Sequence, residues 1–371
     1  MRYFSILTLF LSCISFGQGF PNVANDPSWQ LNDGLSDEFN SEYSPGVVYN
    51  PTKWKYQVPD RACENEACIS GDQNHVSISS DLGTTYLRLT ATQTDKNCTC
   101  MWDDPVVYSK DYTVGNLTGE NEQQYGFFEI RMRIADQPDP GKTFEGLAAN
   151  AWLWRSHEPY NAIWSEIDLA EINANGNYHT CNVIFDPNED DAIPSQENMR
   201  CGDNNLWGSI DCERPDFYLS AGWHTYQVLW TPDYIKLYHD ATLINQTTLG
   251  CPGMEPLNWI VGIGVGTEGQ FNTNMQTNTQ VPYNLDVDYI RTYTLNMDCN
   301  TIINQCNWDP DNYDNKVKKS ITFGGSSSSC INSIDSNPGV YLKATDHIQI
   351  DGNFTVPLGK EFAAEIFTCT D

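Results

Sequence analysis

"SEIDLAEIN", residues 165–173, carries three carboxylates in a stretch that otherwise has the composition of a buried strand. Side chains alternate between the two faces of a strand, so Glu166 and Asp168 share one face. In a regular strand Glu171 would point to the opposite face, together with Ile167 and Leu169. A lone carboxylate among apolar side chains costs free energy, so a regular strand does not explain this stretch.

One extra residue near Leu169–Ala170, a β-bulge, removes the conflict. The apolar residues then face one way and the polar residues the other, the polar set being Glu166, Asp168, Glu171 and Asn173. A helix, which turns about 100° per residue, would separate the acids and scatter the apolar residues. The stretch therefore predicts a bulged strand with an acidic face.

Three carboxylates on one face repel one another, so their pKa values must separate. Two glutamates on either side of a sugar can act as in retaining glycosidases, whose carboxyl groups lie about 5–5.5 Å apart. One attacks the anomeric carbon, and the other protonates the leaving oxygen. Asp168 between them would hydrogen-bond the nucleophile and help to set the proton inventory. Taken alone, the motif also fits a solvated acidic face or a Ca²⁺ site.

The rest of the chain, 371 residues long, is organised around short β-type runs. Between about residues 28 and 295 these runs are punctuated by Gly, Pro, Asn and Asp, which predicts an all-β sandwich of two antiparallel sheets. We expect the main domain to span residues 18–296. Residues 297–371, where the composition becomes polar and Cys-bracketed, are expected to form a small β-rich accessory module. No repeat of solenoid period is apparent.

The first residues, 1–17, are interpreted as a secretory signal peptide, because the apolar run is too short to span a membrane. Lipidation at Cys13, which would give a cell-surface lipoprotein, is the alternative. Of the 13 cysteines, all but Cys13 would remain in the mature chain, an even number. Tight clusters predict structural disulfides and an oxidising, extracellular location; examples are Cys63/Cys68, Cys98/Cys100 and Cys299/Cys306. The pairing cannot be predicted.

Formal net charge is −29, and no basic patch with interleaved aromatic residues occurs. Such a surface repels nucleic acid and anionic membranes, so neither is an expected partner. The acidic balance is typical of a soluble extracellular protein, which we expect to be a monomer.

Several further segments, in order along the chain, carry a resemblance to glycoside hydrolase family 16 in its bulged E-x-D-x-x-E form. They are "DEFN" (37–40), "YGFFEIRMRI" (125–134), "ANAWLW" (149–154), "GWHTYQVLWTPDYIKLYHDATL" (222–243) and "LDVDYIRTYT" (285–294). One departure is Ala241, which stands where the family usually has Gly.

The resemblance implies a β-jelly-roll sandwich with a concave cleft and endo-acting hydrolysis with retention. Glu166 would be the nucleophile, Asp168 its helper and Glu171 the acid/base, with no cofactor for catalysis. The bulged form is shared by enzymes on β-1,3-glucans and on agar, porphyran and carrageenan. The negative charge favours a neutral β-glucan such as laminarin, or an agar-type galactan, over carrageenan. The alternative is a non-catalytic carbohydrate-binding jelly roll.

Aromatic side chains are expected as sugar platforms, because pyranose faces pack on rings. Trp152 and Trp154 share one face of their strand, and Trp164 lies two residues before Glu166. His179 stands where related enzymes place a cleft histidine, although a structural role is equally open. Trp230 is expected in the core. Family members often bind a structural Ca²⁺, for which the matching motifs suggest Glu38 and Asp288; buried salt-bridged acids are the alternative.

Overall fold

The computed structural model describes most of the chain after residue 19. The described residues are 20–21, 23–44, 48–56, 67–100, 106–134, 138–155, 164–173, 179–186, 222–247, 254–266, 274–306, 313–324, 330, 332–333, 339–351, 354–356 and 361–369. The predicted signal peptide and Cys13 lie outside these residues. In the part of the chain described, no helix has the length and apolar character needed to cross a membrane.

The secondary-structure elements of the described residues are β-strands, apart from one short 3-10 helix, η1 (Asp33–Leu35), which confirms the predicted all-β class. The large sheet contains β1 (Trp29–Leu31), β2 (Trp54–Lys55), β3 (Ala67–Ser70), β4 (Val76–Asp81), β5 (Thr84–Thr92), β8 (Tyr112–Gly119), β9 (Gly126–Ile134), β10 (Leu147–Trp154), β11 (Trp164–Asn173), β12 (His179–Asp186), β13 (His224–Trp230), β14 (Ile235–His239), β15 (Thr242–Thr247), β16 (Asn258–Val265) and β17 (Tyr283–Leu295).

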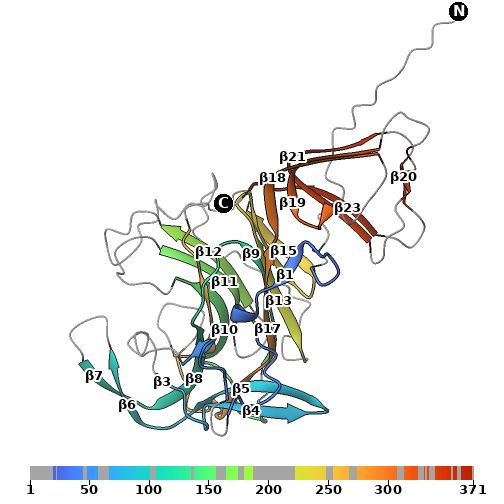
Figure 1. Cartoon of the computed structure of the whole chain (residues 1–371). Helices are drawn as coiled ribbons and strands as arrows, with labels where there is room; N and C mark the ends of the chain where they lie inside the picture. The colour runs from blue at the N-terminus through green and yellow to red at the C-terminus, as the bar shows by residue number, and fades with distance from the viewer. Residues whose placement is uncertain are drawn as a thin grey trace, which may run out of the picture.

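The main path of this sheet runs β12-β11-β10-β16-β8-β5-β17-β9-β13-β14-β15, with antiparallel neighbours throughout. The sheet curls on itself, so that its two halves face each other in a jelly roll (Figure 1). The core lies between the halves, where the rings of Phe128 on β9 and Trp259 on β16 are 6.1 Å apart. Trp230 is fully buried in this core, as predicted. The predicted sandwich is confirmed.

Alternation of side chains, interrupted once in β11, gives the β10–β11 half one apolar and one polar face. The core-facing residues are Ala149, Ala151 and Leu153 on β10, and Ile167, Leu169, Ala170 and Ile172 on β11. The outer face carries Asn150, Trp152 and Trp154 on β10, and the three acids on β11. This half of the sheet therefore positions the candidate site.

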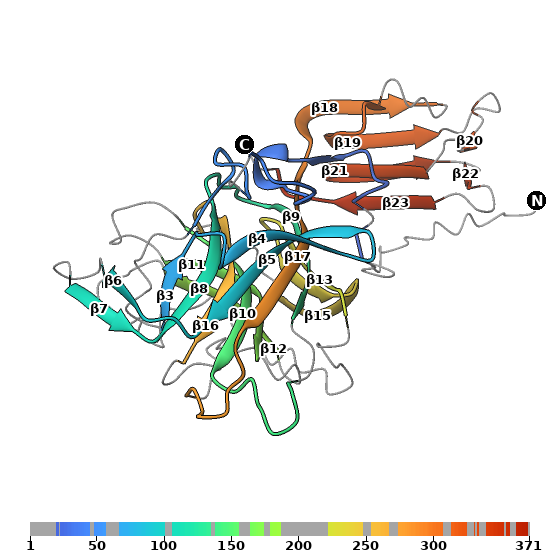
Figure 2. The same ribbon diagram turned by 90° about the horizontal axis from the view of Figure 1, so that it is seen from below.

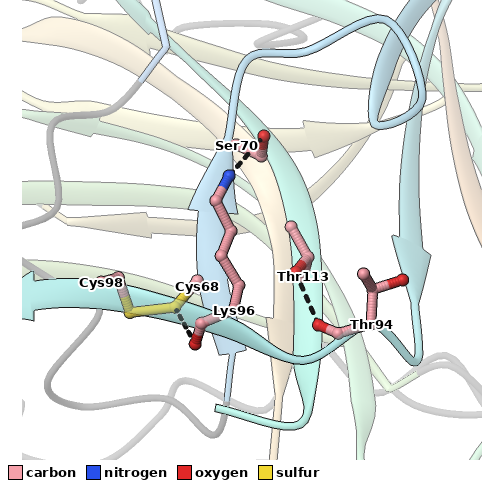
Figure 3. Close-up of a disulfide and its surroundings, with 6 residues drawn as sticks. All are labelled: Cys68, Ser70, Thr94, Lys96, Cys98 and Thr113. Carbon is pink, nitrogen blue, oxygen red and sulfur yellow. Dashed lines mark hydrogen bonds between the residues drawn. A yellow bond between two sulfur atoms is a disulfide. The ribbon is translucent and has the colours of Figure 1, made fainter. Parts of the chain in front are cut away.

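A two-stranded hairpin of β6 (Lys96–Cys100) and β7 (Val106–Lys110) projects from the jelly roll (Figure 1). The Cys68–Cys98 disulfide joins it to β3, and the Lys96 ammonium donates to Ser70 Oγ at 2.9 Å beside the bridge (Figure 3). The other described bridges are Cys299–Cys369 and Cys306–Cys330, and Cys181 is also disulfide-bonded. The predicted disulfides are thus confirmed, and none of the described bridges joins two cysteines of the same cluster.

The chain after β17 forms separate parallel sheets. One contains β18 (Met297–Gln305), β19 (Val317–Gly324), β21 (Gly339–Asp351) and β23 (Glu361–Ile366), stacked in chain order (Figure 2). The other pairs β20 (Asn332–Ser333) with β22 (Phe354–Thr355). Successive strands of the first sheet begin about 20 residues apart and pair in parallel. The spacing of these strands along the chain is regular, but their sequences do not repeat.

This C-terminal part has its own small core, built around Tyr313, Ile321 and Leu342, and it contacts the jelly roll through polar and aromatic groups. Lys343, buried on β21, forms an ion pair with Asp26, which precedes β1. Thr368 N donates to Asp233 Oδ2 at 3.0 Å. The division of the chain at residue 296 coincides with the change of sheet; the role of an accessory module stays a prediction.

Candidate active site

The β-bulge predicted from the acidic stretch is present in β11. On the β10 side, Ala151 is opposite Ala170 and Trp152 is opposite Asp168, which leaves Leu169 as the extra residue. On the β12 side the register shifts at the same place, between Asp168 and Glu171. Leu169 and Ala170 both pack into the core, so Glu171 returns to the outer face beside the other two acids.

The three acids are unequally exposed. Glu166 is 9% exposed and Asp168 only 3%, whereas Glu171 is partly open. Burial first, and then the charges of Glu166 and Glu171, raise the pKa of Asp168 well above its ordinary value. Asp168 also hydrogen-bonds Glu166. The site therefore retains a proton on Asp168 under conditions in which an exposed aspartate is ionised.

Asn182 on β12 completes this arrangement, and the sequence did not single it out. It is opposite Asp168 in the register, and its Nδ2 donates to Glu171 Oε2 at 2.9 Å. Asn182 also hydrogen-bonds Asp168, which partly opposes the rise of the Asp168 pKa. Hydrogen bonds thus connect Glu166, Asp168, Asn182 and Glu171 in one line.

Two of the predicted aromatic residues lie on the same outer face. Trp152 is opposite Asp168 and Trp154 is opposite Glu166, and directly opposed side chains are neighbours. The two rings are 5.5 Å apart with an interplanar angle of 58°. Trp152 is 7% exposed, whereas Trp154 is half-buried, so Trp154 offers the larger open ring surface.

Polar groups on β16 and β8 extend this outer face. Asn258 is opposite Trp154, and its Nδ2 donates to the Gly119 carbonyl at 2.8 Å. Thr118 is opposite Ile260, which is in turn opposite Trp152. These buried polar residues were not predicted, because each is an isolated polar residue in its own strand. Only the pairing of β8, β16 and β10 shows that they lie on the same face as the tryptophans.

Trp164 and His179 are placed only by their backbones. Trp164 begins β11 opposite Asp186, and His179 begins β12 opposite Ile172. Their side chains lie outside the described part of the structure, so their predicted sugar contacts stay predictions.

Glu38 and Asp288, suggested as calcium ligands, are each paired with an arginine. Glu38 accepts two hydrogen bonds from Arg291, at 2.7 and 2.9 Å, and Asp288 forms an ion pair with Arg131. Carboxylates already matched by guanidinium groups do not make up the oxygen-rich shell that Ca²⁺ requires, so these residues do not fit such a site as they are arranged. A structural calcium ion stays a prediction, and no metal enters the chemistry below.

The jelly roll, with three hydrogen-bonded acids and two tryptophans on one face of its sheet, defines the class as glycoside hydrolase. Residues 64–278, more than half of the chain, match the model of glycosyl hydrolases family 16. The chain belongs to this family, whose endo-glycanases hydrolyse O-glycosyl bonds.

Curated relatives and solved structures agree with this assignment. The endo-1,3-1,4-beta-glycanase ExsH of Rhizobium meliloti (strain 1021) is 28% identical over 193 residues, 51% of this chain and 35% of that protein. A keratan-sulfate endo-1,4-beta-galactosidase of Sphingobacterium multivorum is 22% identical over 274 residues, 70% of this chain and 54% of that protein. The chain thus spans between about a third and a half of these relatives' own length.

Among solved structures, LamAcat from Zobellia galactanivorans superimposes with a TM-score of 0.51 at 17% identity, covering 70% of this chain and 96% of that one. The kappa-carrageenase from Pseudoalteromonas carrageenovora superimposes with a TM-score of 0.52 at 22% identity, covering 72% and 95%. At these identities the likeness shows the shared fold.

Proposed function

We propose that this protein is a secreted, endo-acting β-glycanase that hydrolyses a polysaccharide with retention, by double displacement. The observation that carries this proposal is the line of hydrogen-bonded carboxylates on β11. A solvated acidic strand face would leave its acids open to water, whereas Glu166 and Asp168 are almost completely buried. Burying like charges costs free energy, and such an arrangement is typical of catalytic groups.

In the proposed first step, the Glu166 carboxylate attacks the anomeric carbon, and Glu171 gives its proton to the leaving glycosidic oxygen. The glycosidic bond breaks as a glycosyl ester of Glu166 forms. In the second step, Glu171 takes a proton from water, whose oxygen attacks the anomeric carbon and releases Glu166. Two inversions at the same carbon give net retention.

Asp168 and Asn182 are assigned positioning roles. Protonated Asp168 donates to Glu166, which holds the nucleophile's carboxylate in place while leaving it ionised. Asn182 holds Glu171 from the β12 side. Both residues act through the two glutamates.

The proposed substrate is a neutral β-linked glucan or an agar-type galactan. The net charge of −29 opposes the approach of a sulfated polymer, although salt weakens this repulsion. Trp154 and Trp152 would stack on pyranose rings next to the acids. The relatives named as endo-1,3-1,4-beta-glycanase and keratan-sulfate endo-1,4-beta-galactosidase support an endo-acting enzyme on a β-linked polysaccharide. The disulfides support an extracellular place of action.

The nucleophile can be tested by replacing Glu166 with Ala. We expect turnover to fall by at least about 10⁴-fold, because the covalent step is lost. Added azide should restore cleavage of an activated aryl glycoside and give a glycosyl azide of inverted configuration, detected by NMR. Glu120→Gln, at a partly exposed residue paired with Lys55, is the matched control and should keep wild-type activity. Wild-type activity in Glu166→Ala would overturn the assignment.

The substrate can be tested by a reducing-end assay on laminarin, mixed-linkage glucan, agarose, porphyran, keratan sulfate and kappa-carrageenan, with the products sized. We expect rapid shortening of a neutral polymer and a retained anomeric configuration in the first product. Binding without cleavage of any of these polymers would favour the non-catalytic alternative.

A further inference from the structure

A second group of chemistry-bearing side chains lies at the start of β13 and the end of β14, on elements that the proposed reaction does not use. His224 begins β13, His239 ends β14, and Asp240 is the first residue of the turn into β15. One ligand atom from each of these three residues lies within 4.8 Å of the other two. Within the part of the chain that the structure describes, these three residues form the one group whose side chains could together hold a metal ion.

The distances suit a small tetrahedral ion. His224 Nδ1 lies 2.8 Å from Asp240 Oδ2, and His239 Nε2 lies 3.6 Å from the same oxygen. Ligand bonds of about 2.0–2.2 Å at a tetrahedral zinc ion put neighbouring donor atoms about 3.4 Å apart. The two observed separations lie on either side of this value. The 2.8 Å contact is a hydrogen bond between the imidazole and the carboxylate, so the ion would take the place of the proton between them.

The surroundings orient the donor atoms. Thr225 N donates to Asp240 Oδ1 at 2.8 Å, which turns the other carboxylate oxygen toward the two histidines. The Tyr226 ring stacks on the His239 ring with centroids 4.8 Å apart, which fixes the plane of that imidazole. Outer contacts of this kind orient metal ligands in known sites.

The donor atoms also favour a cation. Two nitrogens and one oxygen are a donor set for zinc or a similar transition metal, whereas calcium takes six to eight oxygens.

We propose that His224, His239 and Asp240 bind one divalent transition-metal ion, such as Zn²⁺, with water as the fourth ligand. The ion would tie β13 to the β14–β15 turn, in which Asp240 and Ala241 both have positive φ, 46° and 59°. Its role is structural, since it joins two neighbouring strands at a strained turn.

The test uses the untagged full-length protein, treated with EDTA and desalted, and titrated with ZnCl₂ by calorimetry near pH 7.5. We expect one ion per chain with a dissociation constant of about 10 μM or tighter, and a melting temperature raised by about 3 °C or more in excess zinc. Co²⁺ bound in place of zinc should give the visible absorption bands of tetrahedral cobalt.

Asp240→Asn removes the charge but keeps an acceptor for Thr225 and tolerates positive φ, so it should fold and bind zinc at least about tenfold more weakly. His239→Val, which removes one nitrogen ligand, should also weaken zinc binding at least about tenfold. His75→Gln is the matched control: His75 also pairs with an aspartate, Asp72, at 2.7 Å, and should keep wild-type affinity. Absence of zinc binding to the wild type at 1 mM, or unchanged affinity in Asp240→Asn, would overturn the proposal. If His239→Val does not fold, Asp240→Asn and the cobalt spectrum decide.

Discussion

At the scale of single residues, Asp168 serves the proposed chemistry but lowers the stability of the folded protein. Its carboxyl group is buried between two glutamates, so ionising it in the folded protein is unfavourable. The proposed mechanism needs a proton at this position, donated to Glu166. The same arrangement should therefore make the wild-type protein less stable than a variant with a neutral side chain of the same shape.

Asp168→Asn should raise stability and lower turnover. Because the pKa of Asp168 is raised by folding, the folded state binds a proton that the unfolded state has lost above about pH 4, and wild-type stability falls as pH rises from there toward the raised pKa. The variant lacks this loss and should be about 1 kcal/mol more stable at pH 7. The gain should vanish below pH 4, as urea unfolding across pH will show. A gain independent of pH would contradict the assigned proton.

At the scale of secondary structure, the bulge in β11 absorbs one surplus residue. Leu169 adds a core-facing side chain without a partner of its own on β10. Every residue from Ala170 onward keeps the face it would have in a regular strand one residue shorter. The three acids thus lie on one face of the sheet because the extra residue, Leu169, is inserted between Asp168 and Glu171.

Two single-residue deletions separate the bulge from the strand pattern. Deleting Leu169 leaves a regular strand with the acids still on one face, so the protein should fold, with a loss of about 2–5 kcal/mol from the missing core side chain. Deleting Ile167 shifts Glu166 toward the core and should prevent folding. Circular dichroism and thermal melting of both variants are the measurements. If the two deletions changed stability equally, the face on which the β11 side chains lie would not determine whether the protein folds.

At the scale of the whole molecule, the C-terminal sheet is joined to the jelly roll by a buried charge pair. Lys343 is 1% exposed and contacts Asp26, whose other carboxylate oxygen accepts from Ser28 N at 3.0 Å. Phe367 and Met297 line a small pocket together with Trp29 and Trp230 of the jelly roll. The two parts of the chain therefore share an interior, in addition to a covalent connection at residue 296.

Lys343→Met should destabilise the protein by about 3–5 kcal/mol, because it leaves the Asp26 carboxylate buried without its counter-charge. The double variant Asp26→Leu with Lys343→Met should recover most of this loss, since a buried pair can be replaced by apolar side chains at little cost. Lys319→Met, at an exposed position on the neighbouring strand β19, is the control and should change stability by less than about 0.5 kcal/mol. Chemical unfolding measures all of these variants. Equal stabilities of the single and double variants would exclude the pairing as the cause.

The sequence by itself determined those features that local periodicity encodes. The break in alternation within the β11 stretch was enough to predict the bulge and the common face of Glu166, Asp168 and Glu171. The short β-type runs along residues 28–295 were enough to predict the sandwich. The shared parity of Trp152 and Trp154 followed in the same way. These features depend only on neighbours along one strand, so they can be inferred without knowing how strands pair.

Only the tertiary structure decided which strands lie side by side. Asn182 reaches Glu171 and Asp168 because β12 pairs with β11, and Glu38 meets Arg291 across a separation of 253 residues. The strands after residue 296 pair in parallel, although no repeated sequence pattern predicts this pairing. Hydrogen bonds and ion pairs of this kind depend on distances in three dimensions, and a periodic pattern in one dimension carries no information about them.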